Sequence, residues 1–206
     1  MGSQLGNTQA SAAGLPRHWF LLEQFFARLY GVQPLGPEPD HLFAFNLRPH
    51  GESELRLRCG TRVGPGDTVM ELHFRREGLA PLAAAADPAS MGMGLLLLAD
   101  REVPRLAAAL ENDPRLAGVT SLHALTLFHR GIRRYGFEVM PLEPRLHEWW
   151  FTWWQLRLLV RDHPHGRGSL PGGLNERVVR RVWISRQELL RRYGRNGTRR
   201  GAQAAG

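Results

Sequence analysis

The residues best suited to chemistry are a carboxylate and two imidazoles at the ends of strand-like segments. Thr68–Phe74 alternates in polarity, which places Glu71 and His73 on the same, less apolar face. His129 follows a second apolar run, Leu122–Phe128. Ligands in open sheets bind beyond the carboxyl ends of the strands, so parallel neighbouring strands would bring the two imidazoles together at one edge.

Three roles fit this cluster. Histidine titrates near neutral pH and a carboxylate can orient it, so His129 or His73 could serve as a general base with Glu71 behind it. Two imidazoles and a carboxylate could also hold a metal ion. The chain has no His-x-x-x-His pair, however, and we predict neither a metal site nor another cofactor. The third role is a hydrogen-bonded network that fixes loops at the sheet edge.

Two charged residues flank the cluster and are predicted to bind ligand. Asp67 ends the turn that leads into the Glu71 strand. Arg130 begins a helical turn, where backbone N–H groups and a guanidinium suit an anion such as a substrate phosphate. Arg130 could equally form an ion pair with Glu71, Asp67 or Glu138.

The run Leu122–Phe128 has little polar alternation, which predicts a central strand covered on both faces. It should lead through a polar corner and a short helix, Ile132–Tyr135, into a second strand, Phe137–Met140. The cluster is therefore expected where this central strand ends.

The remaining elements form hairpins early and crossovers late. Leu42–Leu47 and Leu55–Arg58 are predicted to pair as a hairpin closed by His50–Ser53. Met91–Asn112 is a helical stretch that Pro104 should divide or kink. The other predicted elements are a helix at Trp19–Tyr30, a strand at Val178–Ile184, and a helix through Tyr193 that opens with the capping box Ser185-x-x-Glu188.

Interspersed strands and helices of this kind predict an α+β fold: a single domain with a mixed β-sheet and helices packed on it. We expect this domain to span residues 16–193. Residues 1–15 are predicted to be a disordered N-terminal segment, and residues 194–206 a basic disordered tail.

Leu146–Arg161 is apolar on nearly every side of its predicted helix and is too short to span a bilayer, which needs about twenty apolar residues. Such a helix is either buried in a core or dimer, or set against a membrane interface, which indole side chains favour. The predicted contact residues are the four tryptophans Trp149, Trp150, Trp153 and Trp154.

The net charge is concentrated at one end of the chain. All 27 basic residues are arginine, and 9 of them lie in Arg177–Gly206 with Glu188 as the single acid there, whereas the preceding residues carry 18 of each sign. This end is either a solvated tail or a contact for anionic lipid or nucleic-acid phosphates. Because no nucleic-acid motif accompanies it, we predict that Arg180 and Arg181 bind anionic lipid or glycolipid rather than nucleic acid.

Cys59 is the only cysteine, so an intrachain disulfide and a thiolate metal cluster are excluded and a reducing compartment is expected. Met1–Gly14 lacks the apolar core of a secretory signal. We therefore expect a cytoplasmic location, with membrane association left open.

Three motifs resemble the YkoP-like domain family of bacteria: Gly66–Phe74, Leu127–Gly131 with Gly136–Phe137, and Ile184–Leu190. They occur in order between Trp19 and Tyr193. Members of that family stand alone or beside polysaccharide deacetylase and glycosyltransferase domains, so the resemblance implies an envelope-polysaccharide or glycolipid setting. It implies no catalytic residues. Deacetylase chemistry is not carried over, because the paired-Asp motif and spaced His ligands of that fold do not occur here.

Three functions follow as hypotheses. The first is an accessory or binding domain in bacterial envelope polysaccharide or glycolipid metabolism, at the membrane surface and beside polysaccharide-processing enzymes. The second is a hydrolase or transferase in which His129 or His73 is the general base, Glu71 orients it and Arg130 binds substrate phosphate. The third is nucleic-acid binding through the arginine-rich C-terminal end. The sequence leaves open whether the chain is an enzyme and what its oligomeric state is.

Overall fold

The computed structural model describes residues 28–36, 41–75, 78, 88–127, 129–142, 152–153 and 178–195. The chain divides into two units, residues 1–32 and 33–206, and the fold below is that of the second unit. The predictions for residues 1–15, for most of the Trp19–Tyr30 helix and for residues 196–206 of the basic tail lie outside the described residues. So do those for Trp149, Trp150 and Trp154.

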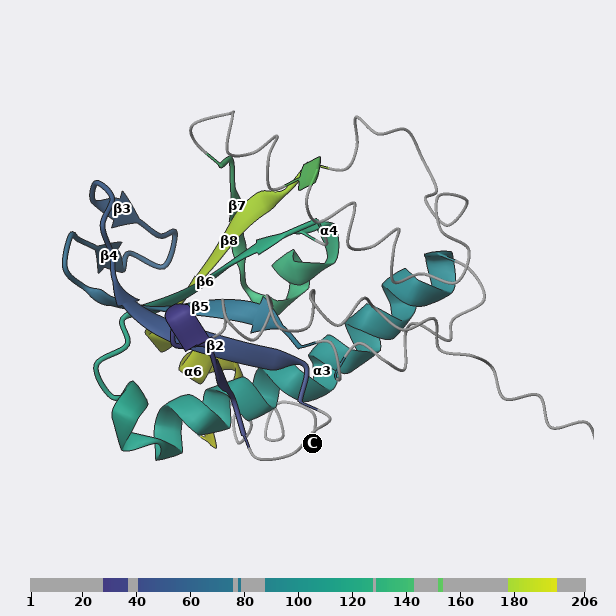
Figure 1. Ribbon diagram of the computed structural model, residues 1–206, viewed down its shortest axis with the longest axis horizontal. Coiled ribbons are helices and arrows are strands. Elements are labelled where there is room, and N and C mark those ends of the chain that lie inside the picture. The colour runs from purple at the N-terminus through teal and green to yellow at the C-terminus, as the bar shows by residue number, and fades with distance from the viewer. Residues whose placement is uncertain are drawn as a thin grey trace, which may run out of the picture. The chain divides into compact units, whose positions relative to one another are not determined.

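A six-stranded sheet organises this unit, in the order β1-β2-β5-β6-β8-β7 (Figure 1). Neighbouring strands are antiparallel except for β5 and β6, which run parallel. The predicted central strand is β6, inside the sheet between β5 and β8. The strands are β1 (Gln33–Pro34), β2 (Phe43–Pro49), β5 (Thr68–Phe74), β6 (Ser121–Thr126), β7 (Glu138–Met140) and β8 (Arg180–Ser185).

The predicted hairpin between Leu42–Leu47 and Leu55–Arg58 is wrong, because these two segments do not pair with each other. β2 pairs along its whole length with β5, and the pairing continues into hydrogen bonds between His50 and the segment Gly66–Asp67. The two short strands β3 (Leu55–Arg56) and β4 (Arg62–Val63) pair only with each other. Residues 50–67 are thus an excursion from a long β2–β5 hairpin. Local alternation at Leu55–Arg58 predicted a strand, but alternation carries no information about which strand it pairs with.

A long helix, α3 (Pro88–Asn112), connects the parallel strands β5 and β6 and lies along the sheet in Figure 1. It is one continuous helix with Pro104 inside it, so of the two predicted effects of this proline the division is wrong and the kink stays a prediction. The face of α3 that packs on the sheet holds the helix together across Pro104, because residues on both sides of it, Val103 and Leu106, are fully buried. This core also contains Met70, Leu72, Leu122, Val182 and Ile184 from the sheet.

Two short α-helices and two 3-10 turns complete the described part of the fold. α6 (Arg186–Tyr193) begins as predicted, because the Ser185 hydroxyl accepts a hydrogen bond from the Glu188 N–H at 3.0 Å and so caps an otherwise unpaired helix end. The polar corner after β6 forms α4 (His129–Ile132) and a 3-10 turn, η2 (Arg133–Tyr135). A further 3-10 turn, η1 (Pro114–Leu116), follows α3. The mixed sheet with these helices confirms the predicted α+β class.

Strand alternation gives the sheet two different faces. The face that carries Met70 and Leu122 packs on α3. The opposite face has a smaller apolar cluster, in which Val69 and Trp183 pack against Leu57 and Val63 from the β3–β4 excursion. The excursion therefore covers one end of this second face, and the polar residues discussed below share that face.

Candidate functional site

The face of the sheet opposite α3 gathers polar side chains from four adjacent strands. Because side chains alternate along a strand, each of these residues is next in sequence to one that packs against α3. We call this set the polar face: Asn46 and Arg48 from β2, Glu71 and His73 from β5, Ser121 and His123 from β6, and Arg181 from β8.

Glu71 and His73 lie side by side on the polar face, where their alternation placed them. The His73 ring is half-buried, and its Nε2 donates a hydrogen bond to Asn46 Oδ1 at 2.9 Å. Burial lowers the pKa of His73, and the nearby Arg48 charge acts in the same direction against an opposing effect of Glu71. Glu71 forms an ion pair with Arg48, whose Nε lies 3.3 Å from its carboxylate.

The polar face contains a second buried imidazole, that of His123, which the sequence reading did not single out. Its exposed fraction is 1%, and in the parallel β5–β6 register it stands directly beside Glu71. Its Nε2 lies 3.2 Å from Arg48 Nη2, and its ring lies 4.6 Å from the ring of Trp183. Burial, followed by the charges of Arg48 and Arg181, lowers the pKa of His123 to about 2. The imidazole is therefore neutral at any physiological pH.

The sequence contains one signal for His123. His123 interrupts an apolar run, and a lone histidine in a strand covered on both faces must find a polar neighbour or bear the cost of burial. Only the register shows that this neighbour is the Glu71–Arg48 pair.

Arg181 closes the polar face on the β8 side. Its Nη1 donates to the Glu52 carboxylate at 2.6 Å, and its side chain is 15% exposed. This ion pair lowers the pKa of Glu52, first through the hydrogen bond from Arg181. Among the residues that the structure describes, three buried polar atoms of this face have no hydrogen-bond partner: Ser121 Oγ, His123 Nδ1 and Arg181 Nε.

The strands β5 and β6 are parallel neighbours, which was the condition set for His73 to meet His129. The second imidazole beside His73 is nevertheless His123, whose pKa is affected by the charge of His73. His129 begins α4, which packs toward α3: a Cβ at Gly131 would lie 2.7 Å from Leu96, and Ile132 packs on the α3 core. His129 thus belongs to an element on the other side of the sheet.

The two flanking charges have different outcomes. Asp67 accepts a hydrogen bond from the Gly64 N–H at 2.7 Å, so its carboxylate closes the turn before β5. The Arg130 side chain lies outside the described residues. Neither residue is brought to the polar face by a described contact.

The predicted membrane contacts are described only in part. Trp153 is helical and 42% exposed, and the neighbouring Thr152 hydroxyl accepts a hydrogen bond from Val179 N–H at 2.9 Å. Arg180 is half-buried on β8, next to Arg181. No helix in the described ranges is long and apolar enough to cross a membrane.

Several arginines of the basic end contact groups within the chain. Arg191 and Arg192 bind the Glu188 carboxylate, and these hydrogen bonds lower its pKa to about 2. Arg186 donates to the carbonyl oxygens of Leu110 in α3 and Leu116 in η1, which ties α6 to the rest of the fold. All of these contacts leave less guanidinium surface for an external phosphate.

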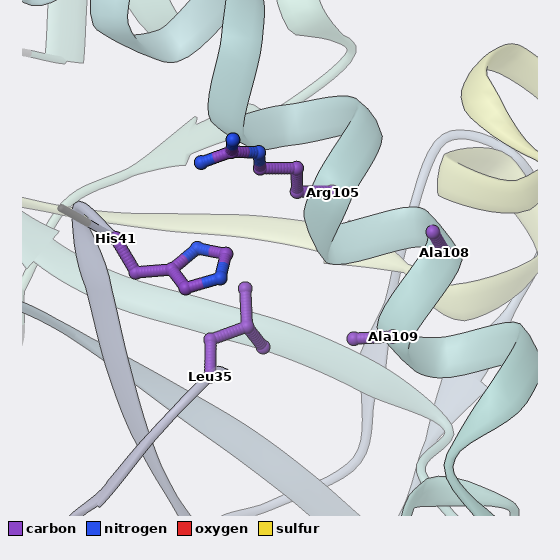
Figure 2. Close-up of a pocket in the computed structure, with 5 residues that line it drawn as sticks. All are labelled: Leu35, His41, Arg105, Ala108 and Ala109. Carbon is purple, nitrogen blue, oxygen red and sulfur yellow. The ribbon is translucent and has the colours of Figure 1, made fainter. Parts of the chain in front are cut away.

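A small cavity of about 240 Å³ lies on the other side of the sheet, against α3 (Figure 2). His41 and Arg105 both point toward it, over Leu35. Both side chains bind the fully buried Glu102 carboxylate. His41 Nδ1 lies 3.0 Å from Glu102 Oε2, and Arg105 Nη1 lies 2.9 Å from Glu102 Oε1. This arrangement holds β2 to α3, and we assign it a structural role. Ala108 and Ala109 complete the lining.

In the part of the chain that the structure describes, no group of three or more His, Cys, Asp or Glu side chains is arranged to hold a metal ion. The polar face presents imidazoles, guanidinium groups, the Asn46 carboxamide and the paired Glu71 carboxylate. Such groups bind and orient oxygen-rich ligands through hydrogen bonds.

Comparison with known proteins identifies a family. The model of a family described as the YkoP domain matches residues 13–193, which include every strand that contributes to the polar face. No curated protein and no solved structure matches the chain. The match confirms the domain resemblance that the three sequence motifs indicated.

Proposed function

Because the chain belongs to the YkoP domain family, we propose that it is a binding domain of bacterial envelope polysaccharide or glycolipid metabolism, whose polar face holds a carbohydrate. The observation that carries this proposal is His123: a fully buried, neutral imidazole with an unused ring nitrogen, set in a sheet face of hydrogen-bonding side chains. Burying such a group without a partner costs free energy, and a ligand that supplies the partner would recover that cost.

The pKa values of the polar face favour binding over acid–base catalysis. A general base works best when its pKa is near the operating pH. The pKa of His123 is about 2 and that of His73 is lowered by burial, while Glu71 is already paired with Arg48. Neutral imidazoles instead donate and accept hydrogen bonds at fixed positions, which is what recognition of sugar hydroxyls requires.

The proposal is tested by titrating isotope-labelled protein with neutral and acidic oligosaccharides and following the backbone amide resonances. We expect shifts that concentrate on β2, β5 and β6 at Asn46, His73 and His123. The amides of α3, which packs on the opposite face, should stay in place. A His73→Asn variant should weaken binding several-fold, because it removes the Nδ1 acceptor whose position the Nε2–H hydrogen bond to Asn46 fixes.

Two outcomes would contradict the binding-domain proposal. One is the absence of shifts with any of the oligosaccharides. The other is turnover of a sugar that is lost in a His129→Ala or His73→Ala variant with an intact fold, which would establish the hydrolase or transferase alternative.

The proposal also places the domain at a membrane surface, supported by the exposed Trp153 and by the excess of arginine in residues 177–206. Trp residues favour the lipid interface, and anionic lipid attracts Arg. We expect the protein to float with anionic vesicles and to stay behind with neutral ones. A Trp153→Ala variant should float less, whereas flotation equal to that of the wild type would remove Trp153 from the contact.

A further inference from the structure

Two buried N–H donors of the polar face lack an acceptor. The two nitrogen atoms are Arg181 Nε and His123 Nδ1. Neither has a hydrogen-bond partner among the described residues. An unmet buried donor costs about 1–3 kcal/mol, so two of them on one face need an explanation.

The tautomer of His123 follows from its contact with Arg48. A guanidinium can only donate hydrogen bonds, so the His123 Nε2 that lies 3.2 Å from Arg48 Nη2 must be the acceptor. The ring is neutral, and its single proton is therefore on Nδ1. His123 Nδ1 is thus an N–H donor that has no acceptor. Arg48 causes this, because its hydrogen bond to Nε2 leaves the ring proton on Nδ1.

The two donors are close neighbours across the antiparallel pair of β6 and β8. In its register His123 stands opposite Trp183 and Leu125 stands opposite Arg181, which makes Arg181 the diagonal neighbour of His123 on the same face. Diagonal neighbours have Cα atoms about 7–8 Å apart, so side chains as long as histidine and arginine can reach the same ligand group.

The charges around His123 allow an anion at this point. The largest charge effects on the His123 ring come from the guanidinium groups of Arg48 and Arg181. Each of them is paired with one carboxylate, Arg48 with Glu71 and Arg181 Nη1 with Glu52, so neither carboxylate is left unpaired to repel an anion. An anionic oxygen also fits two donors better than a hydroxyl or water, because it brings no hydrogen of its own.

We propose that the polar face binds the anionic group of its ligand, a carboxylate or a phosphate, through His123 Nδ1–H and Arg181 Nε–H. This inference rests on the proposed carbohydrate-binding function and specifies its ligand as an acidic or phosphorylated sugar. Arg48 acts as a positioning residue, since it fixes the tautomer of His123 from the opposite side of the ring.

The tautomer is tested first, without any ligand. Nitrogen NMR of the imidazole in the free protein should show His123 protonated at Nδ1 and unprotonated at Nε2. In an Arg48→Met variant this preference should weaken or reverse, while His73 keeps its Nε2 proton because that proton is held by Asn46. A His123 protonated at Nε2 in the wild type would overturn the inference.

The anion site is tested with three probes: inorganic phosphate, glucose 1-phosphate and glucose. Arg181→Lys is the decisive variant, since lysine keeps the charge beside Glu52 but has no donor at the Nε position. We expect it to weaken binding of both phosphate probes about tenfold. Arg58→Lys is the matched control, because the Arg58 side chain is 89% exposed and should leave binding unchanged.

The outcomes separate this inference from the proposed function. Binding of glucose 1-phosphate that exceeds binding of glucose and falls in Arg181→Lys supports both. Equal binding of the two sugars supports carbohydrate binding and overturns the anion site. Binding of inorganic phosphate alone supports the anion site and contradicts the sugar. Failure of both phosphate probes to bind, with the two donors met by water, overturns the inference.

Discussion

A Glu102→Gln variant should lose about 3–5 kcal/mol of unfolding free energy, the range measured when one partner of a buried ion pair is removed. Glu102 is fully buried and accepts hydrogen bonds at both carboxylate oxygens. Oε2 accepts from His41 Nδ1 at 3.0 Å and Leu42 N–H at 3.1 Å, and Oε1 accepts from Arg101 at 3.1 Å and Arg105 at 2.9 Å. Glutamine offers only one acceptor atom, so one pair of donors would face an NH2 group.

Chemical denaturation monitored by circular dichroism measures this loss, and Glu111→Gln is the matched control. Glu111 is on the same helix, but its pair with Arg195 is at the surface, where such pairs contribute about 0–1 kcal/mol. Equal unfolding midpoints for the two variants would show that Glu102 does not hold β2 to α3.

The contribution of Glu102 should also depend on pH. Burial alone would raise its pKa, but the hydrogen bonds from His41 and Leu42 outweigh burial and lower it below the usual 4.5. A carboxylate whose folded pKa is lowered stabilises the fold fully above the unfolded pKa and loses that effect as the pH falls through the folded pKa. The difference between wild type and Glu102→Gln should therefore be full at neutral pH and shrink below about pH 4.5.

Local sequence patterns predicted much of the fold. The apolar run at Leu122 predicted the central strand, and the Ser185 capping box predicted the start of α6, because both signals depend on neighbouring residues alone. The pairing of the strands was harder to predict from the sequence. Of the alternating Leu55–Arg58, only Leu55 and Arg56 form a strand, and it pairs with β4 instead of β2, since β2 pairs along its whole length with β5. Pro104 stays inside a helix because packing on both sides of it outweighs its local effect.

The sequence predicted only the part of the site that follows from the alternation of side chains along one strand. Glu71 and His73 were placed correctly on one face because they are two residues apart in one strand. The link to His123 needs the parallel register between β5 and β6, and the link to Arg48 and Arg181 needs the order of four strands. His129 was favoured as the second imidazole because it follows the strand, yet the chain turns there into α4 and toward α3.

Acidification from pH 7 to pH 4.5 should cost the wild-type protein about 3 kcal/mol of unfolding free energy through His123 alone. The pKa of His123 is lowered from 6.5 to about 2 by burial and by the charges of Arg48 and Arg181. A histidine with a lowered folded pKa binds its proton more readily in the unfolded chain. Its neutral form therefore stabilises the fold fully above about pH 6.5, and this effect declines as the pH falls toward the folded pKa.

A His123→Leu variant isolates this effect, because leucine fills the buried position without a titrating group. Denaturation curves at several pH values should show that its stability falls less steeply than that of the wild type between pH 6.5 and 4.5, by about 2 kcal/mol over that range. Leucine also removes the unmet donor, so the variant should be as stable as the wild type at neutral pH while losing phosphate binding.

Ser121→Ala is the control, since Ser121 shares the strand, the face and the burial of His123 but does not titrate. Its curve should run parallel to that of the wild type. Parallel curves for all three proteins would mean that His123 is not buried as a neutral ring, and the argument for its Nδ1–H donor would fail with it. A buried neutral histidine makes the fold less stable in acid, so we expect it to have a function. The function that its geometry supports is a hydrogen bond from Nδ1–H to an acceptor on a ligand.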